Sequence, residues 1–184
     1  TTKAAAVTSF RTVLSREKAS TLSNYTITFT TPTGVAASAQ IVLTFDNSTS
    51  IPVALDYEDI DLSDDGSDVT LGAAPSGATW GVVRTSSTVI TFTNGSGAVG
   101  AGSVIVIEIG THATSGSTGA EQITNGSAGT TKLTLSGSFG DTGTVAIPII
   151  ADDQVVITAT VDPTISFSIS DKSSSASFVM RTSV

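Results

Sequence analysis

The first candidate for chemistry is an acidic segment around a glycine, within "DIDLSDDGSDVTLG" (59–72). Calcium binds oxygen ligands, and carboxylates gathered on a turn are typical of its sites. An EF-hand is excluded, because the twelfth position counted from Asp61 is Gly72, where that loop needs a glutamate. We therefore expect either another kind of calcium site, with Asp152 and Asp153 as additional candidates, or a solvated acidic turn. No other cofactor is expected, and the candidate calcium ligands are Asp59, Asp61, Asp64, Asp65 and Asp68.

Two patterns that could accompany catalysis fail on their context. Residues 95–100 ("GSGAVG") match G-x-G-x-x-G, but the strand-like run "SVIVIEI" (103–109) follows where a phosphate-binding loop needs a helix. These glycines are expected to form a hairpin loop between two strands. His112, the only histidine, lies on a polar loop, and no G-x-S-x-G elbow occurs. We expect that the protein is not an enzyme.

Asparagine is rare in this chain, and each one begins an N-x-S/T sequon. Such sequons are acceptors for N-linked glycans in exported proteins. The alternative for the two Asn-Gly pairs is a turn, which this dipeptide favours. The glycosylation candidates are Asn24, Asn47, Asn94 and Asn125.

The composition indicates an exported protein. The chain has no cysteine, roughly a third of its residues are Ser or Thr, and only 13% are charged. It begins at Thr1 and its only methionine is Met180, which is typical of a processed N-terminus. The net charge of −8 makes nucleic acid an unfavourable partner, and no apolar run approaches the roughly 20 residues of a membrane span. We expect an extracellular, cell-surface protein.

About a dozen short segments are predicted to be strands, and most of them alternate apolar residues with Thr or Ser, for example "NYTITFTT" (24–31) and "TVITFT" (88–93). This period of two is the signature of strands with one buried face. The apolar run "IPVAL" (51–55) is counted among these strands. Turn residues separate the segments, as in "DDGSD" (64–68) and "NGSAG" (125–129). The pattern predicts an all-β protein, a two-sheet antiparallel sandwich, Ig-like or jelly-roll-like, with a terminal strand extension.

The two ends of the chain differ from its body. We expect a strand over 1–14, a sandwich domain over 15–170, and a serine-rich linker with a last strand over 171–184. Either end could leave its domain and complete the sheet of a neighbouring copy by donor-strand complementation. Alternatively, both are edge strands of their own domain. The donor candidates are Val7, Phe10, Val13, Leu14, Phe178, Met180 and Val184.

Several segments carry a family resemblance: 14–35 ("LSREKASTLSNYTITFTTPTGV"), 61–82, 102–114 and 136–171. Together they resemble secreted β-rich surface proteins of the candidate phyla radiation (Patescibacteria). The resemblance covers most of the chain in order and implies a secreted, cell-surface location. The composition and terminal strands are also similar to those of filament subunits that polymerise by strand donation.

The leading hypothesis is therefore a structural subunit of an extracellular, pilus-like filament, a homopolymer formed by donor-strand complementation. A basic N-terminal end, with Lys3, Arg11, Arg16 and Lys18, and the acidic middle could attract between copies. The alternative is a monomeric adhesin or glycan-binding module that recognises surface glycans or other cells through its loops and Trp80.

Overall fold

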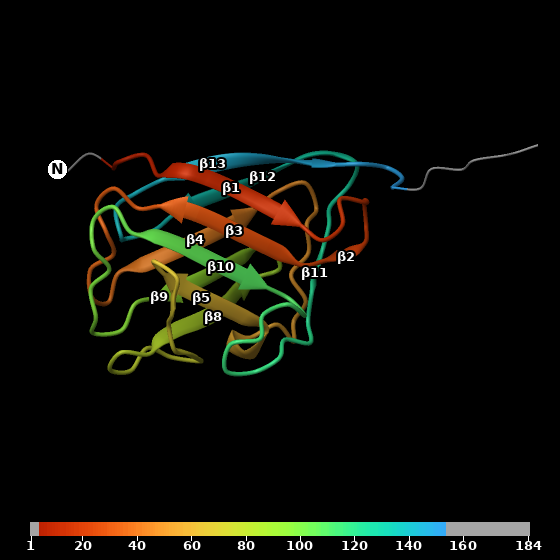
Figure 1. The fold of residues 1–184 in the computed structure, drawn as a ribbon. Coiled ribbons are helices and arrows are strands. Elements are labelled where there is room, and N and C mark those ends of the chain that lie inside the picture. Colours follow the sequence, from red (N-terminus) through yellow and green to blue (C-terminus); the bar gives the residue numbers. More distant parts are fainter. Residues whose placement is uncertain (1–3, 154–184) are drawn as a thin grey trace, which may run out of the picture. The chain divides into compact units, whose positions relative to one another are not determined.

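The computed structural model describes residues 4–153, and within them the fold is a β-sandwich (Figure 1). The first sheet has five strands in the order β1-β3-β10-β5-β6. All its neighbours pair antiparallel. Its strands are β1 (Thr8–Leu14), β3 (Tyr25–Thr30), β10 (Val104–Ile109), β5 (Ile60–Asp64) and β6 (Ser67–Asp68).

The second sheet has six strands in the order β13-β12-β4-β9-β8-β7. Its pairs are antiparallel except β7 with β8, which is parallel. A two-stranded sheet joins β2 (Leu22–Ser23) to β11 (Ile123–Thr124), and a 3-10 turn, η1 (Tyr57–Asp59), precedes β5. The six strands are β13 (Gly143–Ile149), β12 (Gly129–Ser136), β4 (Gln40–Phe45), β9 (Val89–Thr93), β8 (Trp80–Ser86) and β7 (Leu71–Gly72).

The predicted two-sheet sandwich is confirmed, and the alternating pattern explains its core. Every second residue of β3 and β10 faces the second sheet and is buried, while the Thr and Val between them face outward. The second sheet contributes the matching stripes of β4, β9 and β12. Residues with no exposed surface include Tyr25, Ile27, Phe29, Ile41, Leu43, Ile90, Phe92, Ile105, Ile107, Ile109, Leu133 and Leu135.

Two local predictions were wrong. The segment "IPVAL" (51–55) forms no strand, since it turns back through a Leu55 N to Pro52 O hydrogen bond of 3.3 Å. Residues 95–100 do not close a hairpin, because β9 belongs to the second sheet and β10 to the first. The glycine-rich loop therefore crosses from one sheet to the other at one end of the sandwich.

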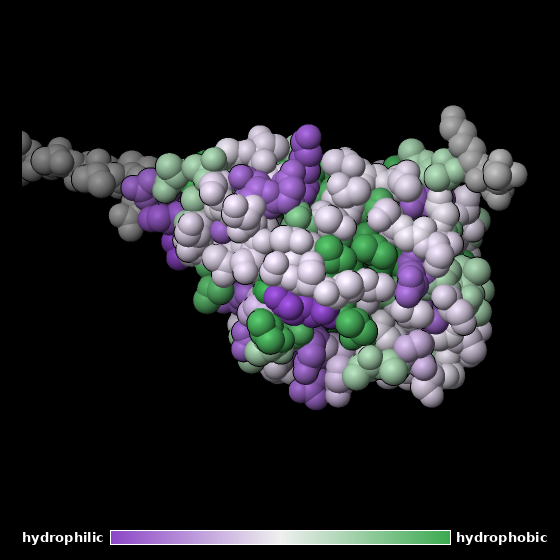
Figure 2. Space-filling model, turned by 180° about the vertical axis from the view of Figure 1, so that it is seen from behind, coloured by the Kyte–Doolittle hydropathy of each residue, from purple (hydrophilic) through white to green (hydrophobic). Residues whose placement is uncertain are grey.

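The face opposite to that of Figure 1 is mostly of intermediate hydropathy (Figure 2). Hydrophobic side chains form small groups on it, separated by pale and hydrophilic ones. This face therefore presents no broad apolar patch. Among the described residues, the structure contains no helix of the length and apolarity that crossing a membrane requires.

Candidate subunit-contact site

The N-terminal strand β1 occupies the edge of the first sheet and hydrogen-bonds β3 of its own chain (Figure 1). This arrangement is the edge-strand alternative of the two that the sequence left open. Phe10 and Leu14 face inward and pack against the core while remaining partly exposed, whereas Val13 faces outward and is 60% exposed. Val7, just before the strand, also packs against the core. No residue of β1 is fully buried, so this strand packs against the core without adding a fully buried side chain to it.

A bulge interrupts the pairing of β1 with β3. The register shifts between Thr8 and Arg11, and Ser9 within this stretch has a φ of 52°. A serine in this left-handed region is strained, because its Cβ crowds the backbone. Bulges of this kind are common on edge strands, where they weaken the exposed ladder. The bulge reduces the number of hydrogen bonds that hold β1 to its sheet.

On its other side β1 meets β13, and the two run parallel along one edge of the sandwich (Figure 1). We call this meeting of β1 (Thr8–Leu14) and β13 (Gly143–Ile149) the seam. Backbone hydrogen bonds close it only at its two ends, since between them the strands pair with different sheets. They join Val7 N to Thr142 O (2.9 Å), Thr142 N to Ala5 O (2.8 Å), Ala19 N to Ile150 O (2.9 Å) and Ile150 N to Glu17 O (2.9 Å).

Two residues of β13 suit this open seam. Pro148 lies on an edge strand, where its lack of an N–H leaves no gap in the ladder. Gly143 lies so close to the side chains of Val7 and Phe10 that a Cβ there would collide with Val7. This contact could not be predicted from the sequence, because a single glycine in a strand has several explanations. Because Gly143 has no side chain, the side chains of Val7 and Phe10 can pack beside β13.

A buried hydroxyl reduces the fit of β1. Thr12 lies between Phe10 and Leu14 on the inward face, and its Oγ1 is buried without a hydrogen-bond partner. Burying an unsatisfied hydroxyl costs about 1–3 kcal/mol relative to a satisfied one. The alternating pattern of the segment could have revealed this residue, since it places a polar side chain in an apolar stripe.

Replacing Thr12 with valine is therefore expected to raise the free energy of unfolding by about 1–2 kcal/mol, because it removes the orphan hydroxyl and keeps the branched shape. Urea denaturation followed by Trp80 fluorescence measures the change. Thr144→Val on the exposed face of β13 is the matched control and should change stability little. Equal effects of both substitutions would mean that the hydroxyl of Thr12 is hydrated.

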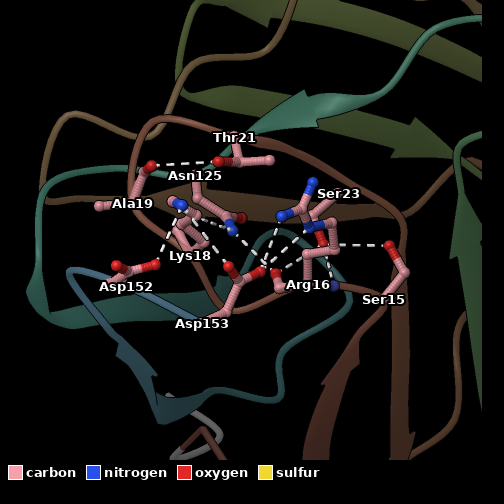
Figure 3. Close-up of polar contacts among 9 residues, drawn as sticks. All are labelled: Ser15, Arg16, Lys18, Ala19, Thr21, Ser23, Asn125, Asp152 and Asp153. Carbon is pink, nitrogen blue, oxygen red and sulfur yellow. Dashed lines mark hydrogen bonds and ion pairs between the residues drawn. The ribbon is translucent and has the colours of Figure 1, made fainter. Parts of the chain in front are cut away.

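Four charged residues fasten the chain just beyond β1 to the chain just beyond β13 (Figure 3). We call Arg16, Lys18, Asp152 and Asp153 the latch. Arg16 Nη2 lies 2.7 Å from Asp153 Oδ2, and Lys18 Nζ lies 3.1 Å from Asp152 Oδ1. The hydrogen bond from Arg16 lowers the pKa of Asp153, and the hydrogen bond to Asp152 raises the pKa of Lys18. Exposed ion pairs are weak, so the latch positions these segments more than it stabilises them.

The latch changes two interpretations of the sequence. Asp152 and Asp153 bind cationic side chains of their own chain, and they lie far along the sequence from the acidic segment. Arg16 and Lys18, half of the proposed basic end, are likewise paired within the chain. Both cationic side chains therefore already have acidic partners within their own chain.

The side chain of Asn125 is buried next to the latch (Figure 3). Its Nδ2 donates to the carbonyls of Arg16 (2.8 Å) and Lys18 (2.9 Å), and its Oδ1 accepts from the Tyr25 hydroxyl at 2.6 Å. Burial raises the pKa of Tyr25, so that hydroxyl stays protonated and can donate. One amide thus fixes the loop that follows β1 to the core.

Burial divides the four sequons into two classes. Asn94 is 1% exposed and Asn125 is 2% exposed, and their amide nitrogens donate to backbone carbonyls. The prediction that these two are glycan acceptors is therefore wrong for the folded chain, because a glycan would need the same nitrogen and open space. Asn24 and Asn47 are partly exposed and stay candidates, although their amide nitrogens donate to the Thr111 hydroxyl and to Ser127 O.

The five candidate calcium ligands do not converge on one site. Asp59, Asp61 and Asp65 accept hydrogen bonds from backbone amides, while Asp68 accepts from the Ser115 hydroxyl at 2.9 Å. In residues 4–153 no three histidine or acidic side chains are grouped so that they could hold a metal ion. Asp64 lies on the opposite face of its sheet from Asp61 and Asp68. The amide donors are Ala120 and Glu121 to Asp59, Thr114 and Ser115 to Asp61, and Val104 to Asp65.

The remaining candidates take other places. Trp80 is only 3% exposed and belongs to the core, so it is not available to stack on a sugar as the glycan-binding alternative required. The Nε2 atom of His112 lies 2.9 Å from Thr26 Oγ1 and 3.9 Å from Glu108 Oε1. The C-terminal donor candidates Phe178, Met180 and Val184 lie outside the described residues, as do the predicted boundary at 170 and the segment 171–184.

Comparison with known proteins adds little to this description. No family model matches the chain, and no curated protein matches it. Among solved structures, it is similar to the pilus backbone protein RrgB from Streptococcus pneumoniae, with 6% identity and a TM-score of 0.38. The match covers 66% of this chain and 26% of that one, so the chain spans about a quarter of that protein. At this level the similarity says nothing of function.

Proposed function

We propose that the protein is a structural subunit of an extracellular filament, in which β1 of one copy takes the place of β1 in the next. The observation that supports this proposal is the state of β1 itself. It is an edge strand without a buried residue, bulged at Ser9, with an orphan hydroxyl at Thr12. Unlike the inward side chains of β3 and β10, those of β1 are all partly exposed.

In the single chain β1 fills its own sheet, so assembly proceeds by exchange. Exchange breaks the ladder to β3 and the bonds at the two ends of the seam, and then forms the same bonds in the neighbour. Such swapping needs no new contact surface, because each interaction lost is regained between copies. If the rotation that relates successive copies does not close, the product is a helical fibre.

The loop between β1 and β2 is the hinge of this exchange. Its fixed points are the latch and Asn125, so β1 is released when the bonds to Arg16 and Lys18 open. Exposed ion pairs weaken with salt, and this makes the latch the easier of the two to open. The C-terminal segment 178–184 is the second donor candidate and would serve the same sheet edge or another.

Electron microscopy of the purified protein tests the proposal. The full chain is expected to form uniform fibres, whereas a chain that lacks residues 1–14 should form none. Deletion of 178–184 tests the second donor in the same way. If neither truncation prevents fibres, strand exchange is wrong, and if the full chain gives only dispersed monomers, the adhesin alternative is favoured.

A complementation assay distinguishes a lost donor from a lost fold. A synthetic peptide of residues 4–14 is added to the chain that lacks 1–14, and binding is followed by fluorescence anisotropy. We expect binding together with a rise in the melting temperature, because the peptide restores the β3 pairing and the contacts of Phe10 and Leu14. A peptide with Phe10 and Leu14 both replaced by serine is the control and should bind at least tenfold more weakly.

A further inference from the structure

A hollow of about 300 Å³ lies beside β5 and β6, at the edge of the first sheet opposite β1. Its walls come from η1, β5, the chain between β6 and β7, and the loop that follows β10. We call it the Tyr57 pocket, after the aromatic residue in its lining. Because β1 belongs to the other edge of the sheet, strand exchange does not involve these walls.

Part of the lining is apolar and held in place. Tyr57, Val69 and Leu71 pack against the core while remaining partly exposed. Asp56 caps the turn that carries Tyr57, since its side chain accepts a hydrogen bond from Glu58 N at 2.8 Å. A partly exposed aromatic ring offers surface that the apolar face of a ligand can cover.

The polar part of the lining presents hydrogen-bond acceptors that the surrounding chain positions. Asp61 Oδ2 accepts from Thr114 N at 2.6 Å and from Ser115 N at 2.8 Å. Asp68 Oδ2 accepts from the Ser115 hydroxyl at 2.9 Å. These bonds use only Oδ2 of each carboxylate, so each Oδ1 can accept a hydrogen bond from a ligand. Groups that are already positioned lose little conformational freedom when a ligand binds.

The charge of the lining restricts the ligand. Glu58, Asp61 and Asp68 bring carboxylates to the pocket, and none of the lining residues is Lys, Arg or His. Carboxylates accept hydrogen bonds and repel anions, so a suitable ligand donates hydrogen bonds and carries no negative charge. Within the part of the chain that the structure describes, no three acidic or histidine side chains are grouped to hold a metal ion. The acceptors therefore suit a ligand with several separate donors better than a single ion.

A sugar ring combines these properties, because it carries hydroxyl groups around its rim and C–H groups on its faces. The volume of the hollow is at the lower end of the range for ligand pockets, which suits one sugar residue. We propose that the Tyr57 pocket binds one residue of a neutral saccharide, with a face of the sugar on Tyr57 and its hydroxyl groups donating to Asp61 and Asp68. Tyr57 thus takes the role that the sequence suggested for Trp80. This inference does not depend on strand exchange.

Saturation-transfer NMR of the full chain tests the pocket. The probes are the methyl glycosides of glucose, galactose, mannose and N-acetylglucosamine, each added alone. At least one is expected to bind, with a dissociation constant on the order of 10⁻³ M. N-acetylneuraminic acid, an anionic sugar, should give no signal. No signal from any neutral glycoside would overturn the proposal, and binding of N-acetyl-lysine amide alone would contradict it in favour of a pocket for cationic side chains.

Variants locate the binding. Tyr57→Ala should weaken it at least tenfold, whereas Tyr57→Phe keeps the ring and should bind nearly as the unaltered chain does. Asp68→Asn, on an exposed residue, removes an acceptor charge and should weaken binding about tenfold. Glu17→Gln removes an exposed charge beyond β1 and is the control that should change nothing.

The fold of each variant is checked by its urea unfolding. If Tyr57→Ala does not fold, the comparison of Asp68→Asn with Glu17→Gln decides. Binding that neither Tyr57→Ala nor Asp68→Asn weakens would place the sugar elsewhere and contradict the proposal.

Discussion

Replacing Asn125 with alanine is expected to lower the free energy of unfolding by about 3–5 kcal/mol. The side chain makes three hydrogen bonds in a buried position, to the Tyr25 hydroxyl and to the carbonyls of Arg16 and Lys18. Alanine would leave the buried Tyr25 hydroxyl and the two carbonyls without these partners. The expected readout is a cooperative unfolding transition with its midpoint at a lower urea concentration and with an unchanged slope of the free energy of unfolding against urea.

Asn47→Ala provides the control for this prediction. Asn47 also begins a sequon and also donates to a backbone carbonyl, that of Ser127 at 2.7 Å, but it is partly exposed. Water can replace its hydrogen bonds, so the cost should be about 1 kcal/mol. If the Asn125→Ala chain is as stable as the Asn47→Ala chain, water satisfies the groups that Asn125 bonds. Asn125 would then not be the anchor of the hinge.

The second large effect concerns a disulfide that ties β1 to its own sheet. Val13 and Thr26 are directly opposite in the register of β1 and β3, and both lie on the outward face. Cα atoms in such a pair are about 4.5–5.5 Å apart, a distance that a disulfide spans. The chain has no cysteine of its own, so a Val13→Cys/Thr26→Cys pair has no competitor. Oxidised as a monomer, this variant should form no fibres, and reduction should restore them.

A second pair controls for general effects of a disulfide. Val83 and Thr91 are opposite each other in the register of β8 and β9, in the other sheet and away from β1. A Val83→Cys/Thr91→Cys disulfide should leave fibre formation unchanged. Electron microscopy and light scattering follow both variants. Fibres from the oxidised β1 variant would mean that assembly does not require β1 to leave its sheet.

The fold could be predicted from the sequence where the signal is local. Ile105, Ile107 and Ile109 alternate with outward residues, and the structure buries all three. The segment 51–55 misled, because an apolar run without alternation does not by itself identify a strand, and here only Ile51 and Leu55 are buried. The stretch 95–100 was correctly expected to be a loop between two strands, yet the sequence alone does not tell whether the next strand joins the same sheet.

The candidate site was less predictable, because its contacts join residues far apart in the chain. Asp153 contacts Arg16 at a separation of 137 residues, and Asn125 contacts Tyr25 at a separation of 100 residues. The sequon pattern placed Asn94 and Asn125 together with Asn24 and Asn47, although burial gives the first two a structural role. The aspartates near Gly66 resemble one cluster in the sequence. Successive residues of β5 face opposite sides of the sheet, however, and this separates Asp61 from Asp64.

The most direct test of strand exchange uses the Val13→Cys/Thr26→Cys chain assembled under reducing conditions and oxidised afterwards. If β1 of each copy lies against β3 of the next, the disulfides join different chains, and a denaturing gel without reductant shows a ladder of covalent multimers. If fibres form but the gel shows only the monomer, each copy has kept its own β1, and the proposed mechanism of assembly is contradicted.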